Sequence, residues 1–272
     1  MNNVVATRLR YGSILVAVVT ALFWTDLHLW VGGPSALVVS LLALAAQAEF
    51  YMMARGDGRA PSVPLGLGMG GIWLAATAFG YASPNLLVGL VMALLLIAVL
   101  GRKPEGASDR LGITLLGFLA VPFLLSQLIE LRGLPDGWAW LIFVVAVSKT
   151  GDSAAFFVGS FFGKHKLIPE VSPNKSWEGA FASLGGAALA GWIVAITCFD
   201  LAPAWTLWLP AALVANLGAQ FGDLSESLLK RSFRTKDSAG LLPAFGGTFD
   251  LVDSFLLAAP ALYLYLVQFA GS

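Results

Sequence analysis

The residues best suited to chemistry lie between positions 218 and 254, where acidic and basic side chains gather between two strongly apolar stretches. A helix over residues 211–231 would carry four polar side chains on one face, at spacings of i, i+3, i+4 and i+7: Asp223, Glu226, Ser227 and Lys230. Two more acidic residues, Asp250 and Asp253, stand three residues apart at the start of the next apolar run. Two helix ends can therefore direct carboxylates at a common point.

The connection between these two helices is basic and contains Lys230, Arg231, Arg234 and Lys236. Carboxylates suit Mg²⁺ and cations suit phosphate groups, so the combination predicts a metal-assisted phosphoryl site. The alternative is a set of helix-end charges held in structural salt bridges near the lipid headgroups. We favour a functional site, because ionisable residues in membrane segments are costly and usually serve a function.

A second polar stretch interrupts the apolar run of residues 138–162, where Lys149 and Asp152 stand three residues apart. A charged residue at the centre of a bilayer costs about 2.5 to 3.5 kcal/mol on insertion scales, and a pair of opposite sign partly offsets that cost. Lys149 and Asp152 either form a self-contained ion pair or line a water-filled cavity shared with Asp223 and Asp250. Gln47 and Glu49, near the inner end of an earlier apolar run, could likewise line a cavity or have structural partners.

A basic loop with several prolines follows at residues 163–179, and Ser176 is a candidate N-cap for the helix after it. Its lysine and serine side chains could hold an anionic headgroup or a triphosphate: Lys164, Lys166, Ser172, Lys175 and Ser176. The alternative is a basic patch beside the membrane that contacts anionic lipid.

The elements that must position these residues are membrane helices. The chain has 272 residues, of which 58% are hydrophobic and only 12% charged, and its mean hydropathy is +0.80. These values predict an all-α, polytopic integral membrane protein. The net charge of +0 gives no indication of a nucleic-acid partner, and the single cysteine, Cys198, excludes an internal disulfide framework and a cysteine-rich metal site.

A bilayer core of about 30 Å requires about 20 apolar residues in a helix, and about nine segments qualify. They are Tyr11 to Val31, Ser35 to Ala54, Val63 to Ala82, Pro84 to Leu100, Leu111 to Leu131, Trp138 to Phe162, Gly179 to Phe199, Trp205 to Leu229 and Asp250 to Phe269. We expect residues 1–135 to form the N-terminal transmembrane helices and residues 136–272 the catalytic transmembrane region of one continuous membrane domain.

The distribution of basic residues predicts the orientation. With nine spans and a cytoplasmic N-terminus, every one of the 16 Lys and Arg residues except Arg132 and Lys149 falls in a cytoplasmic segment. Cytoplasmic loops are enriched in Lys and Arg. The pattern therefore predicts a multi-pass protein of the cell (inner) membrane whose active site faces the cytoplasm.

The two polar stretches together resemble the phosphatidate cytidylyltransferase (CDP-diacylglycerol synthase) family of integral membrane enzymes. The run DSAAFFVGSFFGKHKLIPEVSPNKSWEG, which begins at Asp152, is similar to the first of the family's patterns. The stretch from Gly222 to Asp253 is similar to its signature, whose positions are occupied here by Ser227, Lys230, Arg231, Lys236, Asp237, Ala239, Gly246, Gly247, Asp250 and Asp253. Three signature positions depart from the family: Ala244 and Phe245 replace its Gly-His, and Leu251 replaces its Arg.

The resemblance implies transfer of a cytidylyl group from CTP to phosphatidic acid in phospholipid biosynthesis, with Mg²⁺ as the cofactor and a second metal ion left open. Asp223 and Asp250 would be metal ligands, with Asp253 or Glu226 in support. The catalytic set would be Asp223, Lys230, Arg231, Lys236 and Asp250. The substrate-binding set would be Asp152, Lys164, Lys166, Ser172, Lys175, Ser176, Ser227, Asp237, Gly246 and Gly247.

The expected partners are CTP, phosphatidic acid and the lipid bilayer, with no nucleic acid, and the oligomeric state is left open, a homodimer included. Two other functions also stay open. One is a related CTP-using membrane enzyme, either a polyprenol kinase or a cytidylyltransferase for another lipid phosphate. The other is an ion-coupled transporter in which Lys149, Asp152 and Asp223 form a relay. Release of pyrophosphate from CTP would distinguish an enzyme from a transporter.

Overall fold

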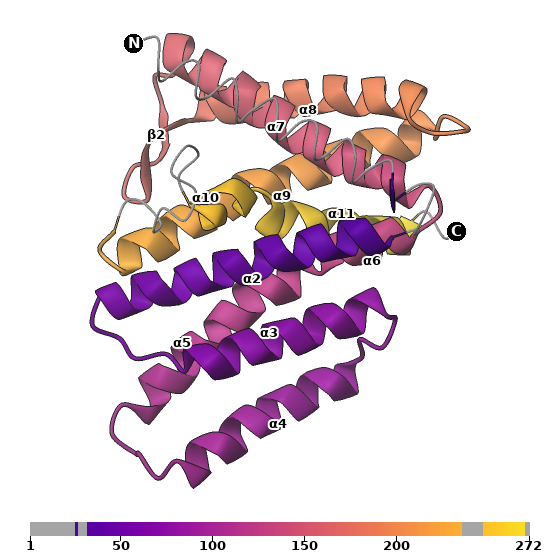
Figure 1. Ribbon diagram of the computed structural model, residues 1–272. Helices are drawn as coiled ribbons and strands as arrows, with labels where there is room; N and C mark the ends of the chain where they lie inside the picture. The colour runs from indigo at the N-terminus through magenta and orange to yellow at the C-terminus, as the bar shows by residue number, and fades with distance from the viewer. Residues whose placement is uncertain (1–24, 27–31, 236–246, 270–272) are drawn as a thin grey trace, which may run out of the picture.

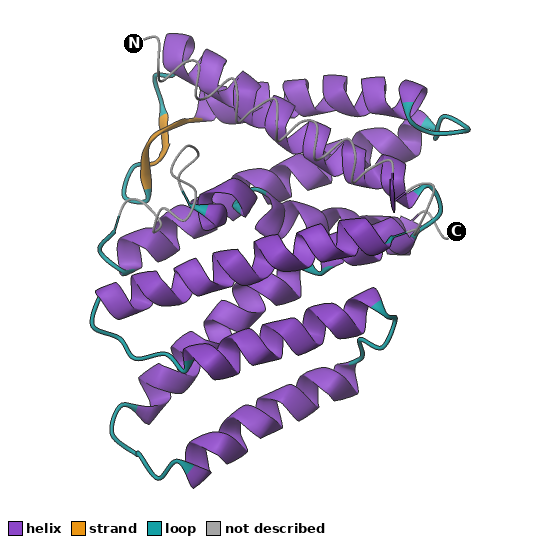
Figure 2. Ribbon diagram, viewed as in Figure 1, coloured by secondary structure: helices purple, strands orange, loops and turns teal. Residues whose placement is uncertain are grey.

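The computed structural model describes residues 25–26, 32–235 and 247–269. Nearly all of the first expected span, and the site candidates Lys236, Asp237 and Gly246, lie outside the described residues. The described chain is a bundle of helices with one short hairpin (Figure 2). Five of its helical stretches are long and apolar enough to cross a membrane: Gly33–Gly56, Ala107–Gly133, Gly137–Phe162, Trp177–Thr197 and Thr248–Phe269. The lengths and composition of these helices confirm the expectation of a mainly helical membrane protein.

The first half of the described chain contains five helical elements and a turn. They are α2 (Gly33–Gly56), α3 (Val63–Ala78), α4 (Pro84–Leu100), α5 (Ala107–Phe118), the π-helical turn η1 (Leu119–Phe123) and α6 (Gln127–Gly133). Helices α3 and α4 are apolar but shorter, with 16 and 17 residues. From α5 to α6 the chain continues as one stretch that is widened at η1, which contains Pro122. Proline lacks the N–H group that a regular helical turn needs, which explains the irregular turn.

The second half carries the polar residues of interest. It consists of α7 (Gly137–Phe162), β1 (Lys166–Ile168), β2 (Ser172–Ser176), α8 (Trp177–Thr197), α9 (Trp205–Ser232), α10 (Thr248–Val252) and α11 (Phe255–Phe269). The helix limits lie within a few residues of those expected, with one difference. The last expected span is interrupted at Asp253 and Ser254, so that a five-residue helix, α10, precedes the longer α11.

The hairpin was not predicted. Strand β1 pairs antiparallel with β2, with Lys166 opposite Ser176 and Ile168 opposite Ser172. Ser176 ends the hairpin and begins α8, where its Oγ accepts a hydrogen bond from Gly179 N at 3.2 Å. The N-cap predicted at Ser176 is therefore confirmed.

Figure 1 shows how the helices are stacked around the C-terminal elements. Helices α7 and α8 pack on one side of α9 and α11, and α2 crosses on the other side, against α10. Helices α3, α4 and α5 lie farther out, beyond α2. The segment that carries Asp250 and Asp253 thus packs against α2, and Lys230 of α9 reaches Asp250.

Helices α9 and α11 approach each other closely at glycines. A Cβ atom on Gly222 would lie 2.5 Å from the backbone oxygen of Asp253, and one on Gly218 would lie 2.6 Å from that of Leu257. Small residues allow such close backbone contact between membrane helices. Because Gly222 directly precedes Asp223, this contact brings Asp223 beside the junction of α10 and α11.

Several basic connections share one end of the bundle. Arg59, in the loop after α2, pairs with Asp109 of α5 at 3.1 Å and lies over the ring of Phe233, just after α9, at 5.7 Å. At the opposite end, the partly buried Arg132 forms an ion pair of 2.6 Å with Asp26, which is buried. The loop after α2, the start of α5 and the end of α9 therefore lie together.

Candidate active site

Three acidic residues converge where α9 meets the junction of α10 and α11. Asp223, Glu226 and Asp253 each present a carboxylate oxygen, and the three oxygens lie within 4.8 Å of one another. The Glu226 residue is only 2% exposed, and the other two are partly buried. Like charges this close repel one another unless a cation compensates them. Oxygen ligands in such a group fit a hard divalent ion such as Mg²⁺.

Asp250 lies beside this group of three and is held by Lys230. The Lys230 Nζ atom is 2.6 Å from Glu226 Oε1 and 3.1 Å from Asp250 Oδ1. Lys230 therefore bridges α9 and α10 and connects Asp250 to the acidic cluster through Glu226. The assignment of Asp250 as a metal ligand stays a prediction, whereas Glu226 and Asp253, expected in supporting roles, lie with Asp223.

Ser254 links the polar pair of α7 to the same cluster. Its Oγ lies 3.1 Å from Asp152 Oδ2 and 2.9 Å from Asp253 Oδ1, and it accepts a hydrogen bond of 3.3 Å from Lys149 Nζ. The direct distance between Lys149 and Asp152 is longer, 3.8 Å. The two residues are thus part of a larger network and not a self-contained pair. Sequence reasoning missed Ser254, although its position directly after Asp253 was a usable signal.

A pocket of about 690 Å³ opens beside the cluster, between α7, the hairpin, α8 and α9. Pockets for small ligands usually measure about 300 to 1,000 Å³. Its wall includes Asp152, Lys166, Lys175, Ser176 and Asp223. The Lys175 Nζ atom is 2.8 Å from Asp223 Oδ2, so a cation from the hairpin reaches the acidic cluster directly. This combination suits a phosphate ester bound together with a divalent ion.

The other predicted residues are more scattered. Ser227 Oγ donates to Asp223 Oδ1 at 3.5 Å, Gly247 is the buried N-cap residue of α10, and Ser172 is partly buried in β2. Lys164, between α7 and β1, and Arg231, in the last turn of α9, are exposed. Of the departures from the family signature, Leu251 lies on α10 and is 38% exposed, whereas residues 244 and 245 lie outside the described chain.

The known proteins to which this sequence is similar are cytidylyltransferases, for which a site with metal and phosphate ligands is suitable. The sequence matches the model of the cytidylyltransferase family over residues 6–269. It is also 32% identical over 270 residues to a phosphatidate cytidylyltransferase of Bacillus subtilis, across 94% of this chain and 97% of that protein. The chain belongs to the cytidylyltransferase family. This match extends far beyond residues 152–253, which carried the resemblance in the sequence.

Other relatives of this cytidylyltransferase-family chain match it over about half of their length. A phosphatidate cytidylyltransferase of Brucella melitensis is 42% identical over 138 residues, 50% of each chain. One of Staphylococcus epidermidis is 35% identical over 133 residues, 49% of this chain and 51% of that protein. Family membership identifies the chain as a nucleotidyltransferase enzyme and sets aside the ion-coupled transporter.

Proposed function

We propose that the protein transfers the cytidylyl group of CTP to phosphatidic acid, which gives CDP-diacylglycerol and pyrophosphate. The observation that carries this proposal is the pocket in which Lys175 reaches Asp223 of a three-carboxylate cluster, within a chain of the cytidylyltransferase family. The near full-length similarity to a protein named phosphatidate cytidylyltransferase supports phosphatidic acid as the acceptor.

In this reaction a phosphate oxygen of phosphatidic acid attacks the α-phosphorus of CTP. The bond from that phosphorus to the bridging oxygen breaks, and pyrophosphate leaves with the electron pair. The attacking oxygen is already an anion, so the reaction needs no strong general base. The protein must instead bring two anions together in the correct orientation and offset their repulsion.

The described side chains suit these tasks. Lys166 and Lys175 line the pocket and would bind phosphate oxygens, while Lys230 holds Glu226 and Asp250 in place. Asp223, Glu226 and Asp253, together with Asp250 in our proposal, would hold Mg²⁺. When bound, that ion would neutralise charge on the reacting phosphates and on the departing pyrophosphate.

The direct test is an assay with purified protein, CTP, Mg²⁺ and phosphatidic acid in mixed micelles. We expect a CDP-lipid and one pyrophosphate per turnover, despite the departures at Phe245 and Leu251. Parallel reactions with a polyprenol and with another lipid phosphate separate the related enzymes, since a kinase would release CDP in place of pyrophosphate. If no CDP-lipid forms while the Bacillus subtilis relative is active in the same micelles, the proposal is wrong.

We also propose that the pocket faces the cytoplasm, where CTP is found. In a Cys198→Ala background, single cysteines at Ser172 and Ser232 should resist a membrane-impermeant thiol reagent in intact cells and react after lysis. A cysteine at Asp200, in the loop between α8 and α9 at the other end of α8, is the matched control and should react in intact cells. Labelling of position 172 or 232 in sealed cells would contradict this orientation.

A further inference from the structure

Glu49 of α2 contacts the helix that carries two of the acidic residues of the site. It is fully buried, and its two carboxylate oxygens accept hydrogen bonds from Thr248 N at 2.9 Å and from Phe249 N at 2.8 Å. These donors are the first two residues of α10, where backbone N–H groups have no partner within the helix. A glutamate from a helix about 200 residues away in sequence therefore caps α10.

Helix α10 depends on such outside contacts for its position. It has only five residues, and so short a helix is not stable alone. Asp250 lies in its first turn, and Asp253 is its C-cap residue. Whatever fixes the start of α10 therefore also fixes where these two carboxylates lie relative to Asp223 on α9.

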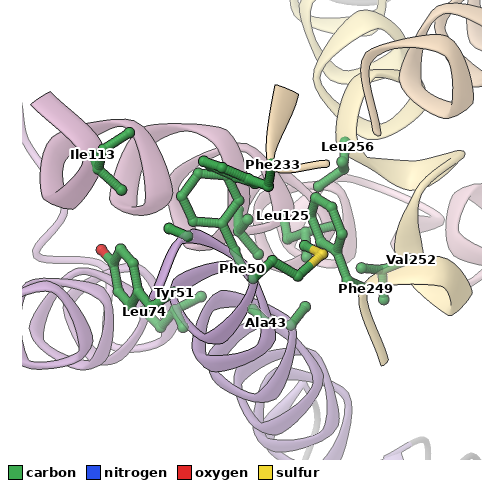
Figure 3. Packing of buried hydrophobic residues seen from close by; sticks show 14 of the residues in the cluster. Ala43, Phe50, Tyr51, Leu74, Ile113, Leu125, Phe233, Phe249, Val252 and Leu256 are labelled. Atoms are coloured by element: carbon green, nitrogen blue, oxygen red, sulfur yellow. The ribbon is translucent and has the colours of Figure 1, made fainter. Parts of the chain in front are cut away.

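The apolar neighbours of Glu49 serve the same alignment. Phe50, the next residue of α2, packs edge-on against Phe249 of α10 at 6.2 Å and against Phe233, just after α9, at 5.3 Å between ring centroids. Figure 3 shows both rings gathered on Phe50 within one buried cluster, with Val252 beside them. Helix α2 thus contacts both of the elements that carry the acidic residues.

We infer that Glu49 is a positioning residue of the active site, which sets the register of α10 and hence the distance from Asp253 and Asp250 to Asp223. This inference rests on the proposed function only for its kinetic consequences. Helix α2, outside the catalytic region expected from the sequence, is then part of the machinery that shapes the metal site.

The test is the variant Glu49→Gln, which keeps the shape of the side chain. Its amide offers one acceptor oxygen, and its NH₂ group would face a backbone N–H group, so one of the two hydrogen bonds is lost. Loss of a side chain that orients metal ligands typically costs about 10- to 100-fold in metal affinity or activity. We expect kcat to fall and the Mg²⁺ concentration for half-maximal rate to rise, each by about 10-fold, with little change in KM for CTP.

Two measurements do not depend on catalysis. Hydrogen exchange of the peptide that covers residues 247–255 should become faster in Glu49→Gln, while exchange in α3 and α8 stays unchanged. Mn²⁺ binding, followed by electron paramagnetic resonance, should weaken by about 10-fold. If Glu49→Gln cannot be purified as a folded protein, the same measurements are made on Glu49→Asp, whose side chain is one methylene shorter and cannot reach both amides.

Gln47 provides the matched control. It is equally buried on α2, but its Nε2 donates to Tyr51 Oη at 3.0 Å and to Gly66 O at 2.9 Å, away from α10. Gln47→Leu should therefore leave exchange at residues 247–255 and Mn²⁺ affinity unchanged. Unaltered exchange and Mn²⁺ binding in Glu49→Gln, or equal changes in both variants, would overturn the inference. A wild-type protein that makes no CDP-lipid would refute the proposed function, while these two measurements would still decide the role of Glu49.

Discussion

Replacing Asp223 with asparagine is expected to reduce cytidylyl transfer by about 10³-fold, while the protein folds and inserts normally. Asparagine keeps the size of the side chain but removes its charge, so the cluster with Glu226 and Asp253 loses one of three carboxylates. Lys175, whose Nζ lies 2.8 Å from Asp223 Oδ2, loses its ion-pair partner at the same time. The measurement is the initial rate of CDP-lipid formation over a range of Mg²⁺ concentrations.

Asp109→Asn is the matched control for this variant. Asp109 forms an ion pair of 3.1 Å with Arg59, and its side chain is 48% exposed. Exposed ion pairs contribute only about 0 to 1 kcal/mol to stability, and this one lies away from the pocket. Its removal should leave the rate unchanged. A rate for Asp223→Asn within a few-fold of the control, at equal protein level, would show that the metal site has been assigned to the wrong residues.

Replacing Lys230 with methionine is expected to lower the rate by about 10²-fold or more. Methionine keeps most of the length of the side chain but leaves Glu226, which is 2% exposed, and Asp250 without the cation that lies within 3.1 Å of both. Removal of one partner from a buried ion pair typically destabilises by about 3 to 5 kcal/mol, so the melting temperature should fall as well. Initial rate and thermal unfolding in detergent are the two measurements.

Lys103→Met serves as the control for the lost lysine, because Lys103 lies exposed in the loop between α4 and α5. It should change neither the rate nor the melting temperature. Lys230→Arg should recover part of the activity, since it restores the charge between the two carboxylates. Full activity of Lys230→Met would contradict the bridging role of this residue.

The polar stripe on α9 could be read from the sequence because it depends only on helical periodicity. Asp223, Glu226 and Lys230 are three or four residues apart, and a helix brings such positions to one face whatever surrounds it. Ser176 was also predictable as a cap, because capping is decided within one turn of the chain. Most of the membrane helices could be predicted in the same way, from the lengths of the apolar runs.

The parts of the site that depend on distant segments were not predictable in this way. The sequence places Asp250 and Asp253 on the same short segment, and nothing local indicates that Asp253 joins Asp223 while Asp250 lies against Lys230. That outcome depends on the break between α10 and α11 and on Glu49, which is 199 residues from Thr248. The hairpin of residues 166–176 was missed because its strands are short and mostly polar.

The contact between Glu49 and α10 also has a consequence for the synthesis of the protein. Chains are made from the N-terminus, so Glu49 enters the membrane long before residues 248 and 249 exist. The Glu226–Lys230 pair forms within one helix and is available as soon as α9 is complete. Glu49 and Asp152, by contrast, acquire their α10 and Ser254 partners only with the final segment. A chain that stops before α10 lacks these partners and Asp253, so the acidic cluster forms only in chains that extend through Ser254.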